Sequence, residues 1–169
     1  MTDFVVREAT PADASALVAL ADAISGEPEG WLVSEGGWRS VAEERRYLRA
    51  LRRYGHAAVF VAEGPGGIIG RLSVARDAHP ASHHVADLGL MVAAAHRRQG
   101  VGRAFLERAV EWARTAGVRK LELHVLPHNE AAIALYEVFG FTREGYRRGH
   151  FRRGSRYEDA ILMAYWVEA

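Results

Sequence analysis

Asp87-Leu-Gly-Leu-Met-Val92-Ala-Ala-Ala-His-Arg97-Arg-Gln-Gly-Val-Gly102 passes from an apolar strand through a glycine-containing turn into a helix. Residues 85–92 have the apolar character of a buried strand, and from about position 101 the apolar residues recur at helical spacing. The first N–H groups of a helix have no partner within it, and the helix dipole favours negative charge at that end. The turn therefore predicts a site for a phosphate or pyrophosphate bound by main-chain N–H groups.

The residue types in this turn suit such a ligand. Gly100 and Gly102 allow the backbone to approach an anion closely. Arg97, Arg98 and Arg103 add guanidinium groups, which are well shaped for phosphate oxygens. The competing interpretation is an ordinary β–α turn with a solvated arginine cluster.

A second block of sequence favours the anion site. Residues 129–141 read Asn-Glu-Ala-Ala-Ile-Ala-Leu-Tyr-Glu-Val-Phe-Gly-Phe. This block resembles the Asn-x-x-A-x-x-x-Tyr-x-x-x-Gly-Phe segment of the GNAT (GCN5-related) N-acetyltransferases, and 97–102 resembles their Arg/Gln-x-x-Gly-x-Gly/Ala signature. Order and spacing agree. The resemblance covers nearly the whole chain, is closest from His83 to Ala164, and there looks similar to the bacterial subgroup that acetylates free amino acids and amino-acid-like compounds.

Composition narrows the class of protein. With 169 residues, the chain is expected to form a single domain, residues 1–169. A net charge of +1 predicts no general affinity for nucleic acid or membrane. The absence of cysteine excludes disulfides, thiolate nucleophiles and cysteine zinc sites. No apolar stretch approaches the ~20 residues of a membrane span, and the start lacks a signal-peptide pattern, so we expect a cytoplasmic protein.

The chain pattern predicts an α/β fold with the order β-α-α-β-β-β-α-β-α-β-β. Strands are expected at 4–7, 57–63, 68–75, 85–92 and 121–125, and helices at about 11–23, 41–54, 100–116 and 130–139. A last hairpin, 141–146 with 157–166, is expected to enclose an arginine-rich turn. The family resemblance implies a mixed, mostly antiparallel sheet of about seven strands, splayed between strands 4 and 5, with helices on both faces.

The same resemblance implies which residues bind acetyl-CoA. In this family the central strand splays from its neighbour and its free backbone groups pair with the pantetheine arm. Gly89, inside that strand, marks either a bulge or close approach by a ligand. The positions implied for acetyl-CoA binding are Leu90, Met91, Val92, Arg97, Arg98, Gln99, Gly100, Val101, Gly102, Arg103, Asn129 and Tyr136.

Tyr136 matches the family tyrosine that protonates the departing CoA sulfur. Proton transfer from a phenol of pKa ~10 to a thiol of pKa ~8.5 is uphill by only about 2 kcal/mol before the site tunes either group. The alternative is an amphipathic core residue. Asn129 is either a helix cap or also a ligand of the CoA arm.

Asp87 is the candidate base, because many similar sequences carry a glutamate there that removes a proton from the incoming ammonium. The aspartate side chain is shorter than a glutamate and reaches less far towards the amine. His83 or His84, each with an ordinary pKa of ~6.5, is the alternative base. The remaining histidines have no metal-ligand spacing, so we expect no metal.

The acceptor region is less distinct. Trp31 and Trp38 lie in a glycine-containing loop over 25–40 and either border a site or close the core. The expected turn carries five arginines, which suit a carboxylate on the acceptor, or else contact solvent or a second subunit in a homodimer. These arginines are Arg147, Arg148, Arg152, Arg153 and Arg156. The candidate acceptor-binding residues are Trp31, His83, His84, Arg148 and Tyr157.

Together these features predict an N-acetyltransferase that moves the acetyl group of acetyl-CoA to a primary amine by direct attack in a ternary complex. A small α-amino acid or close analogue is the expected acceptor, because an α-amine of pKa about 7.7–8 needs less help to become neutral than a lysine near ~10.4. The carboxylate of a free amino acid raises the pKa of its amine somewhat, but gives an arginine of the hairpin turn a group to bind bidentately. The rivals are a protein N-terminal or ribosomal-protein acetyltransferase and a non-catalytic acyl-CoA-binding regulatory module. Tyr136 favours catalysis, since a pure binder needs no proton donor.

Overall fold

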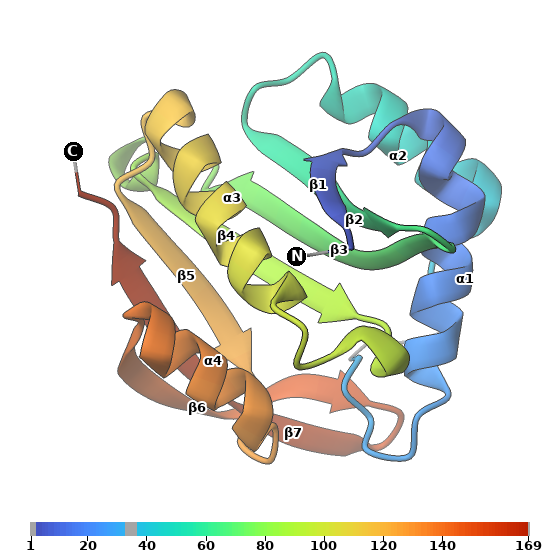
Figure 1. Ribbon diagram of the computed structural model, residues 1–169. Helices are drawn as coiled ribbons and strands as arrows, with labels where there is room; N and C mark the ends of the chain where they lie inside the picture. The colour runs from blue at the N-terminus through green and yellow to red at the C-terminus, as the bar shows by residue number, and fades with distance from the viewer. Residues whose placement is uncertain (1–2, 33–36, 169) are drawn as a thin grey trace.

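The computed structural model describes residues 3–32 and 37–168, in which seven strands form one sheet of order β1-β2-β3-β4-β5-β7-β6 (Figure 1). Neighbouring strands are antiparallel except for the parallel pair β4 and β5. This arrangement confirms the expected mixed, mostly antiparallel sheet. The strands are β1 Val5–Glu8, β2 Ala57–Gly64, β3 Gly67–Arg76, β4 Val85–Val92, β5 Lys120–Val125, β6 Thr142–Arg153 and β7 Arg156–Trp166.

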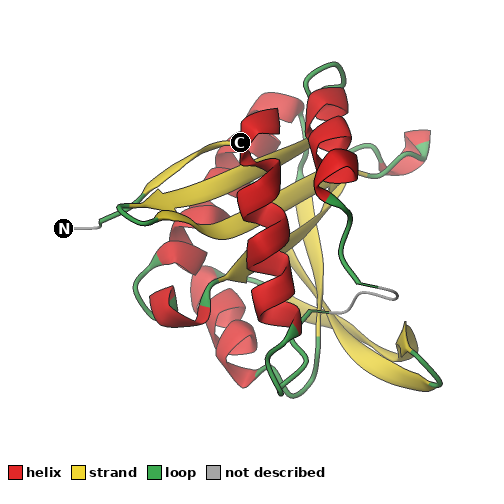
Figure 2. Ribbon diagram, turned by 90° about the vertical axis from the view of Figure 1, so that its right-hand side faces the viewer, coloured by secondary structure: helices red, strands yellow, loops and turns green. Residues whose placement is uncertain are grey.

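Helices cover both faces of the sheet (Figures 1 and 2). The pair α1 (Ala14–Ser25) and α2 (Val41–Leu51) packs on one face, and the pair α3 (Val101–Ala116) and α4 (Glu130–Phe139) packs on the other. Alternation along β2 explains the two cores: Phe60 and Ala62 pack with α3, whereas Val59 and Val61 pack with α1 and α2.

The first helix begins later than the sequence pattern predicts. Pro11–Asp13 forms a short 3₁₀ turn, and α1 starts at Ala14. The Asp13 carboxylate accepts a hydrogen bond from the Thr10 N–H at 2.7 Å and pairs with Arg7. The Arg7 hydrogen bond holds the pKa of Asp13 below its ordinary value. These contacts stabilise the tighter turn ahead of the helix.

The final hairpin corrects another expectation. Instead of a long arginine-rich turn, β6 and β7 continue to Arg153 and Arg156 and leave only Gly154-Ser155 between them. The Asp159 carboxylate accepts hydrogen bonds from the Gly149 N–H at 2.7 Å and the Tyr146 hydroxyl at 2.8 Å. These bonds stabilise the irregular register after Arg147, so the strands extend beyond the body of the molecule (Figure 2).

Two kinds of feature are absent from the described residues. No helix in 3–32 or 37–168 is both long and apolar enough to cross a membrane. The same ranges hold no group of three or more His, Asp or Glu side chains arranged to hold a metal ion.

Candidate active site

The sheet opens between β4 and β5. Their register consists of Val85↔Lys120, Ala86↔Leu121 and Asp87↔Glu122, and beyond Asp87 the two strands diverge. The β4 edge over 88–92 therefore has no pairing with β5. An extended ligand can pair with such an edge through main-chain hydrogen bonds. The predicted splay is confirmed.

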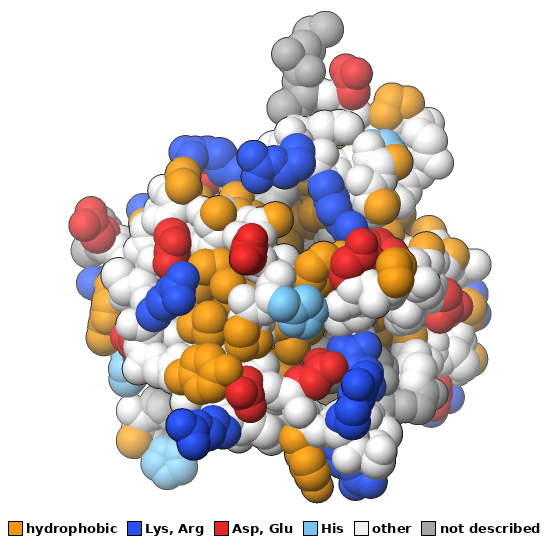
Figure 3. All heavy atoms as spheres, turned by 90° about the horizontal axis from the view of Figure 1, so that it is seen from below, with side chains coloured by type: hydrophobic (Ala, Val, Ile, Leu, Met, Phe, Trp, Pro, Cys, Tyr) orange, Lys and Arg blue, Asp and Glu red, His pale blue; other side chains and the backbone are white. Residues whose placement is uncertain are grey.

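A cavity of about 570 Å³ lies at this opening. It is bounded by the segment after α1, the end of β4, the 97–102 turn and the facing side of α4. Figure 3, which views the molecule from below, shows hydrophobic side chains on this face close to several Lys and Arg side chains. The lining residues are Ile24, Glu29, Trp31, Leu32, Leu90, Met91, Val92, His96, Arg97, Arg98, Gly100, Gly102, Arg103, Asn129, Ala131, Ala132, Leu135 and Tyr136.

The turn before α3 has the backbone shape of an anion site. Arg98 and Gly100 have φ angles of 63° and 88°, both in the left-handed region, and Gly100 caps α3. Left-handed residues in such a turn can direct successive N–H groups into one concavity. The Val101 side chain is buried in the core, so this residue can serve a ligand only through its backbone. The Gln99 amide donates to the Ala95 carbonyl at 3.0 Å.

The arginines of the turn are not equivalent. Arg97 donates to both Glu27 carboxylate oxygens at 2.7 Å and to the Val92 carbonyl at 3.0 Å. Although it lines the cavity, its guanidinium ties the segment after α1 to the turn. Arg103 pairs with Glu107 in an exposed contact, whose strength water screens. Arg98, which also lines the cavity, has no such partner within 3–32 and 37–168.

Gly102 has a packing role that sequence reasoning missed. A Cβ atom at this position would lie 2.6 Å from Leu135 Cδ2 on α4. The glycine therefore lets the first turn of α3 approach α4, in addition to any approach by a ligand. A Cβ atom added at Gly100 would have no atom within 4 Å. Glycine is therefore favoured at this position by the positive φ angle and not by close packing.

Tyr136 is both a core residue and a cavity residue. Its side chain is 6% exposed, and its ring lies 5.7 Å from the Phe141 ring. Its hydroxyl has no hydrogen-bond partner in the described part of the chain. Burial raises the pKa of Tyr136, so it keeps its proton at neutral pH. Asn129 caps α4 by accepting from the Ala132 N–H at 3.3 Å and also lines the cavity, so its two suggested roles are compatible.

Asp87 lies at the opening, on the face opposite α3. Its Oδ1 is 3.7 Å from Nδ1 of His124, which follows the last paired residue of β5 by two positions. Desolvation, and then the negative charge of Glu122, raise the pKa of Asp87 to about 6. Solvent still reaches 66% of the Asp87 side chain, which moderates this shift.

His124 is a candidate that sequence reasoning missed. Its Nε2 is buried and has no hydrogen-bond partner among the described residues, and its ring stacks on His150 at 4.3 Å. Burial and the neighbouring His150 lower the pKa of His124, which favours the neutral, proton-accepting ring. The alternation of buried Leu121, Leu123 and Val125 gave a signal, since it directs residue 124 to the other face.

The other acceptor candidates are dispersed. His83 has a ring nitrogen 3.3 Å from the Ala78 carbonyl, and His84 stacks on Trp166. Both precede β4 and lie roughly 20 Å along the chain from Leu90, at about 3.3 Å per strand residue. Neither lines the cavity.

The remaining candidates divide between the cavity and the hairpin. Trp31 lies on the cavity wall and stacks on His128. Arg148 and Tyr157 are exposed on the extended hairpin. Gly89 pairs with Ser73 in continuous register, so the bulge suggested for it is wrong.

The comparison with protein families agrees with this geometry. Residues 23–141 match the model of the acetyltransferase (GNAT) family. The chain belongs to this family. Among structures of GNAT proteins, an acetyltransferase from Streptococcus pneumoniae has a TM-score of 0.87 and 28% identity over 98% of this chain and 99% of that one.

Two curated relatives differ in how much they match. An Escherichia coli protein named L-amino acid N-acetyltransferase AaaT is 28% identical over 97% of this chain and 98% of its own length. The E. coli ribosomal protein bS18-alanine N-acetyltransferase is 45% identical, but over 41% of this chain. The chain spans 47% of that relative, about half its length.

Proposed function

We propose that this protein transfers the acetyl group of acetyl-CoA to the α-amine of a small amino acid or close analogue, by direct attack within a ternary complex. The observation that carries the proposal is the opening between β4 and β5. The cavity lies at this opening beside the 97–102 turn, and Asp87 and His124 flank the same opening on the face opposite α3. Donor and acceptor can therefore meet from opposite sides of the sheet.

The cavity suits the donor in shape and charge. The turn offers main-chain N–H groups and the Arg98 guanidinium for a pyrophosphate. Leu90, Met91 and Val92 offer an apolar wall and the unpaired strand edge for an amide-containing arm. Asn129 lies on the facing wall, where its amide can contact the same arm.

The incoming nitrogen loses one proton before it attacks and a second as the amide forms, and the leaving sulfur gains one. The amine nitrogen attacks the thioester carbonyl carbon, the C–S bond then breaks to release the CoA thiolate, and the second nitrogen proton replaces the one given to the sulfur. We assign the proton on the leaving sulfur to the Tyr136 hydroxyl, which has no competing hydrogen bond in the described chain. Desolvation raises the pKa of a thiolate in the same cavity as well as that of a phenol, which limits the mismatch between them.

The proton lost by the incoming ammonium passes to the Asp87–His124 pair, directly or through water. An Asp87 carboxylate of pKa about 6 is more basic than an ordinary aspartate yet remains ionised at neutral pH. The neutral His124 ring offers a second acceptor. Such modest bases suit an α-amine, because its pKa is about 7.7–8 at a peptide terminus, well below that of a lysine at about 10.4. The carboxylate of a free amino acid raises the pKa of its amine above this value, so the base has more to do for that acceptor.

The amino-acid acceptor is supported by the nearly full-length match to the protein named L-amino acid N-acetyltransferase. The second candidate is acetylation of a protein N-terminus, which the partial match to the bS18-alanine acetyltransferase favours. Both acceptors present an α-amine, so the acetyl-transfer chemistry is the same. They differ in whether a carboxylate or a peptide bond follows the α-carbon.

A panel of amines tests the proposal. Thiol release from acetyl-CoA is measured with free amino acids, with peptides that begin with alanine, and with polyamines. We expect the fastest release with one or more free amino acids. Preferred turnover of peptides supports the second candidate, and acetyl-CoA binding without release for any amine supports a non-catalytic module. A cytoplasmic location stays a prediction.

A further inference from the structure

The face of the sheet opposite α3, which the acceptor is proposed to approach, continues from β5 onto the hairpin of β6 and β7. Alternate residues of β7 point to opposite faces of the sheet. Ile161 and Met163 pack in the core with α3 and α4. Ala160 and Leu162 therefore point to the acceptor face.

Pairing along the sheet places Arg147 on this acceptor face. His124 of β5 pairs with Leu162, and Arg147 of β6 pairs with Ala160. Directly paired residues of neighbouring strands point to the same face. His150, three residues after Arg147, stacks on His124 with 4.3 Å between the ring centroids. The hairpin segment that carries Arg147 therefore lies against the two proposed bases.

The charge of Arg147 acts on both of these bases. Desolvation and the charge of Glu122 raise the pKa of Asp87, and the Arg147 charge opposes this rise. Burial and the neighbouring His150 lower the pKa of His124, and the Arg147 charge adds to the lowering. Coulomb interactions weaken with distance and are screened by salt. Both effects agree with the strand pairing, which places the guanidinium near the two side chains.

The guanidinium of Arg147 is available to a ligand. Lys120 Nζ, on the same face, forms two ion pairs of 2.9 and 2.8 Å with glutamates of β5 and β6. Arg153, near the end of the hairpin, donates to the Gly30 carbonyl at 2.8 Å. In contrast, Arg147 is exposed and has no hydrogen bond or ion pair within 3–32 and 37–168. An anion in solvent can therefore reach it.

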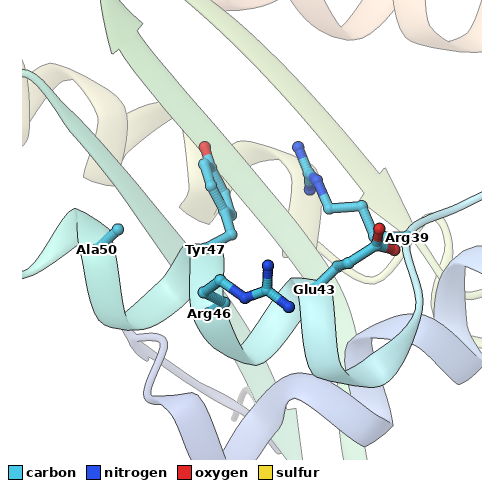
Figure 4. Close-up of a pocket in the computed structure, with 5 residues that line it drawn as sticks. All are labelled: Arg39, Glu43, Arg46, Tyr47 and Ala50. Carbon is cyan, nitrogen blue, oxygen red and sulfur yellow. The ribbon is translucent and has the colours of Figure 1, made fainter.

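A second group of arginines lies apart from the bases. Arg39 and Arg46 line a hollow of about 440 Å³ on α2 (Figure 4). Helix α2 packs on β2, which is two strands from β4 in the sheet. Arg39 is also paired with Glu44 at 2.9 Å. This hollow therefore offers no cation to an acceptor at the opening between β4 and β5.

We propose that Arg147 binds the carboxylate of the acceptor and so selects α-amino acids over amines without a carboxylate. The inference rests on the proposed acetyltransferase function and assigns this contact to Arg147 in place of Arg148. One carbon atom separates the amine of an α-amino acid from its carboxylate, so the carboxylate ligand must lie close to the bases that face the amine. Arg147 meets this condition, and a guanidinium can hold a carboxylate through two parallel hydrogen bonds.

The experiment compares an amino acid accepted by the wild-type protein with its carboxamide. The measured quantity is the ratio of their kcat/KM values in wild type, Arg147→Met and Arg147→Lys. Amidation also lowers the pKa of the amine, but this effect is common to all variants and cancels when their ratios are compared. Arg143→Met is the matched control, because Arg143 is an exposed arginine of the same strand that pairs with Glu137 of α4.

We expect the ratio of amino acid to carboxamide to fall about tenfold in Arg147→Met, since one charge-assisted contact exposed to water is lost. Arg143→Met should keep the wild-type ratio. Arg147→Lys retains the charge but not the paired hydrogen bonds, so its ratio should be intermediate. Turnover of the carboxamide should persist in all variants, because Asp87 and His124 remain.

An unchanged ratio in Arg147→Met overturns the inference, as does an equal fall in Arg143→Met or a fall in Arg148→Met alone. Acetylation of peptides but of no free amino acid also overturns it, and supports the second candidate function. Failure of the wild type to acetylate any amine instead overturns the proposed function.

Discussion

At the scale of single residues, Tyr136 is a core side chain that also lines the cavity, and we assign it the proton on the leaving sulfur. Its ring belongs to the core while its hydroxyl has access to the cavity. Because burial raises its pKa, the phenol stays protonated until a strong base forms next to it. By ordinary pKa values the transfer to the departing thiolate is uphill, and desolvation of that thiolate in the same cavity makes it more basic, so the phenol can give up its proton only late in the reaction.

Tyr136→Phe should therefore lower kcat by about 10²- to 10⁴-fold while acetyl-CoA affinity stays nearly constant. Steady-state kinetics and calorimetric titration measure the two quantities. Tyr165→Phe is the control, because Tyr165 packs in the same aromatic cluster, on Phe139 and Phe141, but does not line the cavity. A Tyr136→Phe variant with wild-type kcat would assign the proton to water.

Asp87 gives a prediction about pH. Its active form is the carboxylate, and its pKa is raised to about 6 by desolvation and Glu122, while the Arg147 charge opposes the shift. Activity should be present above pH 6 and fall as pH decreases through it, by about tenfold per unit. The acid side of the kcat profile measures this. His124 faces Asp87 from β5, and burial lowers its pKa, so the two groups are coupled and the observed pKa belongs to the pair.

Asp87→Asn should lower kcat and remove or displace that acid limb. Asp77→Asn, a change at an exposed aspartate, should leave the limb in place. If the limb is the same in Asp87→Asn, then Asp87 is not the base. His124→Gln then tests the histidine by the same profile.

At the scale of elements, the contact between α3 and α4 sets the shape of the cavity. Gly102 of α3 lies against Leu135 of α4, and Leu135 lines the cavity next to Tyr136. A methyl group at 102 would require the Leu135 side chain to move, because 2.6 Å is far inside van der Waals contact. The sequence motif alone cannot distinguish this packing role from a role in anion binding.

Gly102→Ala should therefore weaken acetyl-CoA binding about tenfold, or about 1.4 kcal/mol, as measured by calorimetry. Leu135→Ala in the same chain removes the clash and should restore most of the affinity. Gly100→Ala should also weaken binding, through its φ of 88°, but should not be rescued by Leu135→Ala. Equal rescue of both variants would contradict the separate roles.

At the scale of the whole molecule, the cavity joins parts of the chain that are distant in sequence. The segment after α1 is tied to the turn by Glu27 and Arg97, and its Gly30 carbonyl accepts from Arg153 of β6 at 2.8 Å. Trp31 in the same segment stacks on His128, which precedes α4. A ligand in the cavity therefore contacts elements from both halves of the sheet.

Acetyl-CoA should accordingly stabilise the folded state as a whole. At 100 times Kd the gain is about 2.7 kcal/mol, or roughly 5–10 °C in Tm for a chain of this size. Thermal unfolding with increasing acetyl-CoA measures this shift. A short acetyl thioester without the nucleotide and pyrophosphate should give a much smaller one. No shift at saturating acetyl-CoA would remove the cavity as the donor site.

The local pattern of the sequence determined the order of elements, the β4–turn–α3 unit and the Tyr136 helix, because these depend on periodicity and residues close in the chain. The local pattern did not predict the full length of the hairpin strands. Their extension depends on a contact between Asp159 and Gly149, which lie ten residues apart in the sequence. The Asp87–His124 pair came only from the tertiary structure. Its members lie on different strands, and whether they meet depends on strand order and register, which no local signal encodes.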